Sequence, residues 1–185
     1  VAAEKHAGEL EPASAQANIA LIQIYGWMHR EDDAVAEAKR AFLKTPTAAA
    51  PHFFLGFVYV QQKKPEDAIR EFRWSIEHDG GSGAALAGLA YAQAMGGHKE
   101  EALKVVRDLE DPASPARPVG YPMAAAYAAL GSTDEAFRWL GQAVRKQDQW
   151  LTRLDVDPIM DPLRADPRFA DVSRRVGFAG KSAPP

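Results

Sequence analysis

The chain has 185 residues, 22 basic and 25 acidic side chains, a formal net charge of −3 and no cysteine. This length allows about 70% of the unfolded surface to be buried. The absence of cysteine excludes disulfides and cysteine-ligated metals and leaves the redox compartment open. Basic and acidic residues are intermixed, so no basic surface is expected to bind nucleic acid directly. No apolar run reaches the roughly 18 residues of a membrane span, so we expect no membrane segment either.

The predicted elements begin with an incomplete one. Residues 1–12 are expected to be the truncated end of a preceding helical unit, because Ala7 and Pro12 fall in register with later units. We therefore expect the chain to be a fragment of a longer protein. The first complete unit, 15–48, is predicted to contain two helices, with Asp32 as the N-cap of the second.

The second unit, 49–82, shows the pattern most clearly. Apolar residues at helical spacing precede a turn at 61–64, and Pro65 with two following carboxylates is typical of the first turn of a helix. The run Gly80-Gly81-Ser82-Gly83 supplies residues that tolerate left-handed backbone and should end this helix. This segment is predicted to be one helical hairpin.

The third and fourth units, 83–116 and 117–148, are rich in alanine. Gly97 and Gly131 are expected to turn the chain between the two helices of each unit. Four prolines between residues 111 and 122 exclude a continuous helix there, so the connection between these units should be long.

The four units repeat at a fixed 34-residue step. The positions in register are Ala34, Ala68, Ala102 and Ala136; Leu21, Leu55, Leu89 and Met123; and Tyr25, Tyr59 and Tyr127, with Gln93 as the exception. This pattern resembles the tetratricopeptide repeat. The resemblance covers residues 13–148 and implies an all-α, right-handed superhelical solenoid of helical hairpins that binds proteins without catalysis.

After residue 148 the pattern changes. Prolines at 158, 162 and 167 exclude a long helix, and we predict a capping segment over 149–178 that ends in a short helix at 167–176. Residues 179–185 are expected to be disordered. The DP…DPLR.DPRF run is similar to the end of tetratricopeptide arrays in bacterial multidomain signalling and transcription regulators.

The resemblance also implies where a partner would bind. In this family the first helices of the hairpins line a concave groove, and here those positions are apolar or aromatic, which suits a peptide or protein partner. The residues expected to bind it are Ile19, Gln23, Trp27, Phe53, Phe57, Tyr91, Met95 and Tyr121. The alternative is a groove filled by the chain's own C-terminal segment.

No constellation for catalysis, metal binding or a cofactor is visible. The five histidines never occur as a helical pair three or four residues apart, and no serine, histidine and acid follow a recognisable pattern. We therefore expect a scaffold rather than an enzyme. The alternative is a regulatory module of a transcription factor, kinase or cyclase, which could self-associate through Trp139, Trp150 or its end hairpins as a homodimer.

Overall fold

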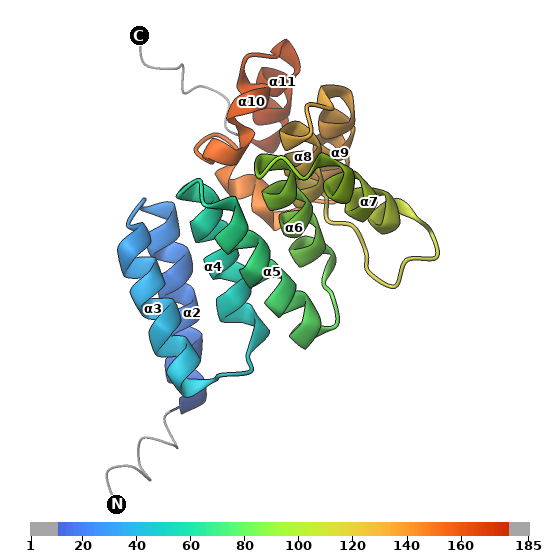
Figure 1. The fold of residues 1–185 in the computed structure, drawn as a ribbon. Helices are drawn as coiled ribbons and strands as arrows, with labels where there is room; N and C mark the ends of the chain where they lie inside the picture. Colours follow the sequence, from blue (N-terminus) through green and yellow to red (C-terminus); the bar gives the residue numbers. More distant parts are fainter. Residues whose placement is uncertain (1–10, 178–185) are drawn as a thin grey trace, which may run out of the picture. The chain divides into compact units, whose positions relative to one another are not determined.

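The structure is a computed structural model that describes residues 11–177, without the side chains of residues 11–15 and of Trp27. It contains helices and turns and, among the described residues, no strand (Figure 1). The all-α prediction is confirmed. The expectations for residues 1–10 and for the tail from 178 onward lie outside the described part of the chain.

The chain divides into two compact units, which meet in sequence between Gly81 and Ser82. Unit 1 contains α2 (Glu11–Trp27), α3 (Glu31–Lys44), α4 (Ala49–Gln61) and α5 (Pro65–Asp79). Unit 2 contains α6 (Gly83–Met95), α7 (Lys99–Glu110), α8 (Gly120–Ala129) and α9 (Thr133–Arg145). It continues with the short helices η1 (Gln149–Arg153), η2 (Pro158–Met160), α10 (Asp161–Arg164) and α11 (Pro167–Val176).

The helices pair as four hairpins, α2 with α3, α4 with α5, α6 with α7 and α8 with α9. The second helices begin at residues 31, 65, 99 and 133, so the 34-residue step of the sequence is also the step of the structure. The helix predicted to begin at Pro65 does so. The domain boundary predicted after residue 12 falls inside the first turn of α2.

The same turn joins the two helices of every hairpin. It places one residue in left-handed backbone, at His29 (φ 54°), Lys63 (φ 56°), Gly97 (φ 87°) and Gly131 (φ 79°). The following N–H then donates to a carbonyl five residues back, as Arg30 does to Tyr25 at 2.9 Å and Ser132 to Tyr127 at 2.9 Å. This bond closes the first helix and positions the second.

The predicted N-cap of α3 is wrong. Arg30, not Asp32, occupies the N-cap position, and its side chain makes no capping bond. Because the left-handed residue is His29, the helix begins at Glu31 and Asp32 falls inside its first turn. There its carboxylate, with those of Glu31 and Asp33, favours the positive end of the helix dipole.

Small residues set the distance between paired helices. The repeated alanines Ala34, Ala68, Ala102 and Ala136 are all fully buried. In α4, a Cβ on Gly56 would lie 2.8 Å from the ring of Phe72, and in α8 a Cβ on Gly120 would lie 2.8 Å from the Cα of Ala143. The helices of a hairpin therefore approach closely at these positions.

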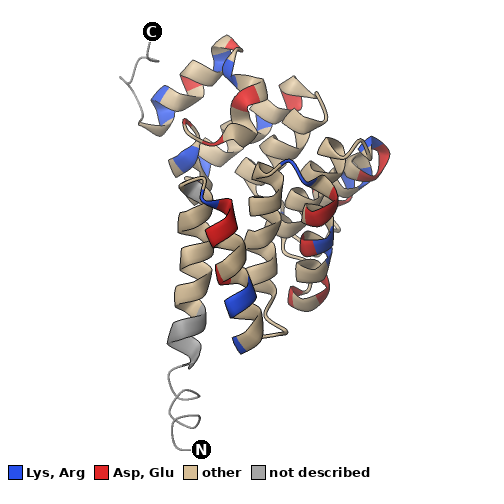
Figure 2. Ribbon diagram, turned by 60° about the vertical axis from the view of Figure 1, so that its left-hand side comes forward, with Lys and Arg blue, Asp and Glu red and all other residues tan. Residues whose placement is uncertain are grey.

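First and second helices differ in chemistry. The sequences of α4, α6 and α8 contain no Asp, Glu, Lys or Arg, whereas α3, α5, α7 and α9 carry both signs of charge. Figure 2 shows the charges on the second helices and on the C-terminal segment, with acidic and basic residues interspersed.

One buried cluster of unit 1 lies between α2, α3 and α4. Ile22, Ala34, Leu55 and Val58 are buried in one cluster. Glu37 of α3 is also buried, and its carboxylate accepts hydrogen bonds from Asn18 Nδ2 at 2.6 Å and from Arg40. The buried charge is thus neutralised and hydrogen-bonded, as burial requires.

The C-terminal segment packs on the last hairpin of unit 2. Helix α11 contacts α9, while η2 and α10 contact α8. Helices η2 and α11 begin at prolines, because a proline's missing N–H is not needed in a first turn. Asp157 and Asp166 cap these two helices, accepting from Ile159 N at 3.1 Å and from Arg168 N at 2.9 Å. The helix predicted at 167–176 is α11.

Candidate interaction site

Two aromatic side chains of α4 belong to the predicted site and lie next to each other. Phe53 and Phe57 stand one helical turn apart with ring centroids 5.2 Å apart and nearly perpendicular. Both are half-buried, and the ring of Phe72 of α5, which is fully buried, lies 5.0 Å from that of Phe57. We call Phe53 and Phe57 the aromatic face of unit 1.

The predicted residues of α2 occupy the equivalent positions of the preceding hairpin. Ile19 and Gln23 are both half-buried, and they lie one step of the repeat before Phe53 and Phe57. Helix α2 packs against α4. The side chain of Trp27, the third residue predicted on this helix, lies outside the described residues.

The predicted residues of unit 2 differ in exposure. Tyr121 of α8 has 1% of its surface exposed, Tyr91 of α6 has 9% and Met95 has 36%. Tyr121 stands two steps of the repeat after Phe53. Tyr121 is therefore too deeply buried for an external partner to contact it.

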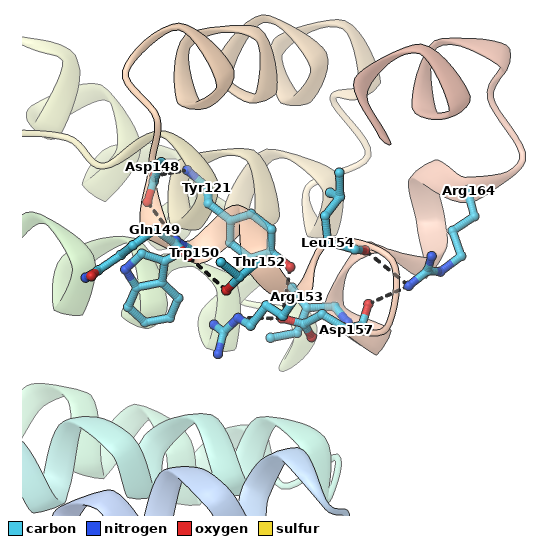
Figure 3. Close-up of polar contacts among 10 residues, drawn as sticks. Tyr121, Asp148, Gln149, Trp150, Thr152, Arg153, Leu154, Asp157 and Arg164 are labelled. Atoms are coloured by element: carbon cyan, nitrogen blue, oxygen red, sulfur yellow. Dashed lines mark hydrogen bonds and ion pairs between the residues drawn. The ribbon is translucent and has the colours of Figure 1, made fainter. Parts of the chain in front are cut away.

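The C-terminal segment is what buries Tyr121 (Figure 3). The Tyr121 hydroxyl donates to Asp157 Oδ2 at 2.9 Å, and the Tyr121 N–H donates to Asp148 Oδ2 at 3.0 Å. Arg153 Nε lies 3.1 Å from the same Asp157 oxygen, and its guanidinium is 4.2 Å from the Trp150 ring centroid. We call Tyr121, Trp150, Arg153 and Asp157 the Asp157 cluster.

Burial changes the pKa values of the two predicted tyrosines of unit 2. Burial raises the pKa of Tyr121 well above its ordinary value, and the Asp157 carboxylate raises it further, while Arg153 opposes the shift. Burial also raises the pKa of Tyr91 to about 12, with smaller contributions from Asp157 and Asp161. In both tyrosines burial is the largest cause of the raised pKa, and carboxylates of the C-terminal segment add to it.

The backbone around Asp157 is fixed as well. Arg164 Nη2 donates to the carbonyl of Asp157 at 3.1 Å and lies 3.4 Å from that of Leu154 (Figure 3). Five large apolar side chains of this segment are at most 5% exposed, and they are Leu151, Leu154, Ile159, Met160 and Leu163. Their burial contributes about 8 to 15 kcal/mol as an upper estimate.

Sequence reasoning missed the polar residues of the Asp157 cluster. It found the apolar residues of the segment and its final helix, but it gave no role to Asp157 or Arg153. The available signal was an aspartate directly before a proline, a common way to cap a short helix. The sequence did not show that the Asp157 carboxylate would bind a tyrosine hydroxyl 36 residues earlier in the chain.

The predicted dimer contact at Trp139 is wrong. Its side chain is 3% exposed, and its Nε1 donates to Glu110 Oε1 at 2.9 Å. The indole lies in the core of unit 2 and joins α9 to α7. Trp150 is half-buried beneath Arg153 and belongs to the Asp157 cluster.

Unit 1 also contains a stacked column of rings. Phe42, His52, Trp74 and His78 follow one another with centroids 4.2, 3.7 and 3.6 Å apart. His52 Nδ1 lies 2.6 Å from a Glu71 carboxylate oxygen. The column links α3, α4 and α5, and its role in the structure is packing.

The described part of the chain holds neither a metal-binding cluster nor a membrane-spanning helix. Within residues 11–177, no group of three or more histidine, cysteine or acidic side chains is placed to bind a metal ion. No helix in this range is both long enough and apolar enough to cross a membrane.

The chain matches no protein-family model, and no curated protein is significantly similar to it.

Proposed function

We propose that the chain is a tetratricopeptide-type module that binds another protein and catalyses no reaction. Three observations support this. The hairpins recur at a constant step along the chain, the same left-handed turn closes each first helix, and the repeated alanines are all buried where paired helices meet. This combination is typical of solenoids that present the surface of their first helices to a partner.

The binding site of the proposal is the aromatic face of unit 1. Phe53 and Phe57 offer two half-buried rings at the spacing of one helical turn. The absence of charged residues from α4 carries the proposal, because a charged partner group buried there would lose water without gaining a counter-charge. The partner is therefore an apolar surface, such as one side of an amphipathic helix.

A second function is favoured by one observation in unit 2. The Tyr121 hydroxyl is bound by Asp157 of the same chain, so the position equivalent to Phe53 is filled intramolecularly. This arrangement suits a regulatory module of a larger bacterial regulator, in which unit 2 has a structural role and binds no external partner at this position. The two functions are compatible because they use different units.

The test is a selection of 12-residue peptides from a random library against the immobilised full chain. The affinity of an enriched peptide is then measured by isothermal titration. Phe57→Ala should weaken binding at least tenfold, because truncating a central aromatic anchor costs about 2 kcal/mol or more. Leu43→Ala is the matched control, since Leu43 of α3 is 85% exposed, and it should leave the affinity unchanged.

Two outcomes would overturn the proposal. One is a peptide that binds Phe57→Ala as tightly as the unaltered chain. The other is a set of enriched peptides dominated by acidic or basic residues, because helix α4 offers no charged side chain to pair with them.

A further inference from the structure

The stacked column of unit 1 encloses a histidine that the proposed function does not use. The ring of Phe42 from α3 stacks on His52 with centroids 4.2 Å apart, and the ring of Trp74 from α5 stacks on it at 3.7 Å. Two rings this close cannot share one face of an imidazole, so they cover both faces. At the ring edge, His52 Nδ1 lies 2.6 Å from Glu71 Oε2 of α5. The side chains of His52 and Glu71 are 15% and 16% exposed.

Protonation changes what this contact contributes. An ionised carboxylate only accepts hydrogen bonds, so Nδ1 of His52 carries a proton and donates to Glu71 in either charge state of the ring. A second proton, at Nε2, makes the ring a cation and converts this bond into a charge-assisted ion pair. The faces of Phe42 and Trp74 also attract a cation. Partial burial opposes the charge, and three favourable contacts act against it.

Two further titratable groups lie near this pair. Burial, and then the charge of Glu71, raise the pKa of Tyr59 on α4, so its hydroxyl stays neutral near neutral pH. His78 stacks on the other face of Trp74 with centroids 3.6 Å apart. It is exposed, and its Nδ1 donates to the Trp74 carbonyl at 2.8 Å. The charge next to His52 on α5 is therefore that of Glu71.

The other helices that pack on α4 bind their charges elsewhere or have none. On α3, Arg40 binds Glu37, and Lys44 Nζ donates to Asn18 Oδ1 at 3.0 Å. Helix α2 has no charged residue after Glu11. The side chain that α3 places on the imidazole is an uncharged phenyl ring.

The repeat contains a version of the same contact that does not titrate as an imidazole does. One step earlier, Asn18 Nδ2 donates to Glu37 Oε2, also at 2.6 Å. In unit 2 the equivalent positions carry no titratable side chain, and they are Leu86, Val105, Gly120 and Trp139. Among the four hairpins, the one formed by α4 and α5 therefore has an imidazole at this position.

We propose that His52 makes the packing of unit 1 depend on pH, because its protonated ring binds Glu71, Phe42 and Trp74 more strongly than its neutral ring does. The unfolded chain lacks these contacts, so the folded state favours the protonated form. The stability that this contact adds is therefore greatest where the imidazole is protonated. It is lost as the pH rises through the range in which imidazoles lose their proton, between about pH 5 and about pH 8.

The first test is urea unfolding of the full chain at about pH 5.5 and about pH 8, with and without His52→Asn. This variant restores the pair of asparagine and glutamate found in the first hairpin. The ratio of the unfolding constant at the higher pH to that at the lower pH should be at least about threefold larger in the unaltered chain than in the variant. His78→Asn is the control. It removes an exposed imidazole that stacks on the same indole, and it should keep the ratio of the unaltered chain.

Two further measurements keep the test valid if His52→Asn does not fold. Glu71→Gln removes the charge and keeps an acceptor, so it should lower the same ratio. Hydrogen exchange of the unaltered chain needs no variant. After correction for the direct effect of pH on exchange, the protection of α4 and α5 should fall between the lower and the higher pH, while that of α8 and α9 should not change.

Two results would overturn the inference. One is a ratio of unfolding constants that is the same in the unaltered chain, in His52→Asn and in Glu71→Gln. The other is protection that changes equally in both units or in neither. None of these measurements includes a peptide, so failure of the inference is distinct from failure of the proposed function.

Discussion

Phe53 in unit 1 and Tyr121 in unit 2 occupy the same position of the repeat, yet their surroundings differ. Phe53 is half-buried next to another half-buried ring, whereas Tyr121 is 1% exposed and its hydroxyl donates to Asp157. The hairpins that carry them have the same step, the same turn and the same uncharged first helix. The difference therefore comes from the C-terminal segment, not from the hairpin.

This comparison shows that a repeat position does not by itself define a binding site. A tyrosine at this position needs a hydrogen-bond partner when it is buried, and in unit 2 the segment after α9 supplies a carboxylate. A phenylalanine carries no such requirement and can receive an apolar surface from outside. Substitutions that alter one unit at a time test this difference.

The largest expected effect comes from truncating a core side chain of the C-terminal segment. Leu154 is fully buried, and Leu154→Ala should lower the free energy of unfolding by about 2 to 5 kcal/mol through lost burial and the cavity left behind. Denaturant unfolding followed by circular dichroism measures this. Val156→Ala is the control, since Val156 is 75% exposed, and it should change stability by less than about 0.5 kcal/mol. Equal effects would show that the segment is not part of the core.

A smaller effect is expected from glycines where paired helices meet. In Gly120→Ala the new methyl group would meet the backbone of Ala143, and in Gly56→Ala it would meet the ring of Phe72. Overpacking of this kind costs about 1 to 3 kcal/mol. Gly120→Ala should lie at the upper end and Gly56→Ala below it, because a backbone cannot rotate away as a side chain can. The reverse order in thermal unfolding would contradict this account of helix packing.

A further substitution, Tyr121→Phe, gives unit 2 the side chain that unit 1 has at this position. Tyr121→Phe removes the hydroxyl that binds Asp157 and leaves a buried carboxylate with fewer partners, which should cost about 1 to 2 kcal/mol. The converse change in unit 1, Phe53→Tyr, adds a hydroxyl at a half-buried site and should be close to neutral. Chemical denaturation of both variants checks the pair. A Tyr121→Phe variant as stable as the unaltered chain would mean that the Asp157 cluster contributes nothing.

The smallest effect concerns the turns. Unit 1 uses His29 and Lys63 in left-handed backbone, whereas unit 2 uses Gly97 and Gly131. Lys63→Gly should stabilise unit 1 by up to about 1 kcal/mol, and Gly131→Ala should destabilise unit 2 by about 1 kcal/mol. Nothing lies within 4 Å of a Cβ at Gly131, so the effect is one of backbone conformation alone. Differential scanning calorimetry should show opposite shifts in melting temperature.

The sequence allowed much of the fold to be predicted. The 34-residue step identified the paired helices, Pro65 marked a helix start, and Pro167 marked the last helix, because these signals act within a few residues of the chain. The N-cap of α3 was misplaced for two reasons. Acidic residues are common both at the N-cap and in the first turn of a helix, and the left-handed residue that precedes this helix is not a glycine. The Asp157 cluster could not be predicted, since the contact between Tyr121 and Asp157 depends on the path of the chain between them.

The most direct test of the account is hydrogen exchange of the full chain with and without a library-selected peptide, followed by mass spectrometry. The peptide is expected to slow exchange in α4, over residues 49–61, and to leave exchange in α8 and in residues 149–164 unchanged. Slower exchange in α8, or faster exchange in residues 149–164 on binding, would show that the partner displaces the C-terminal segment and would contradict the distinction between the two units.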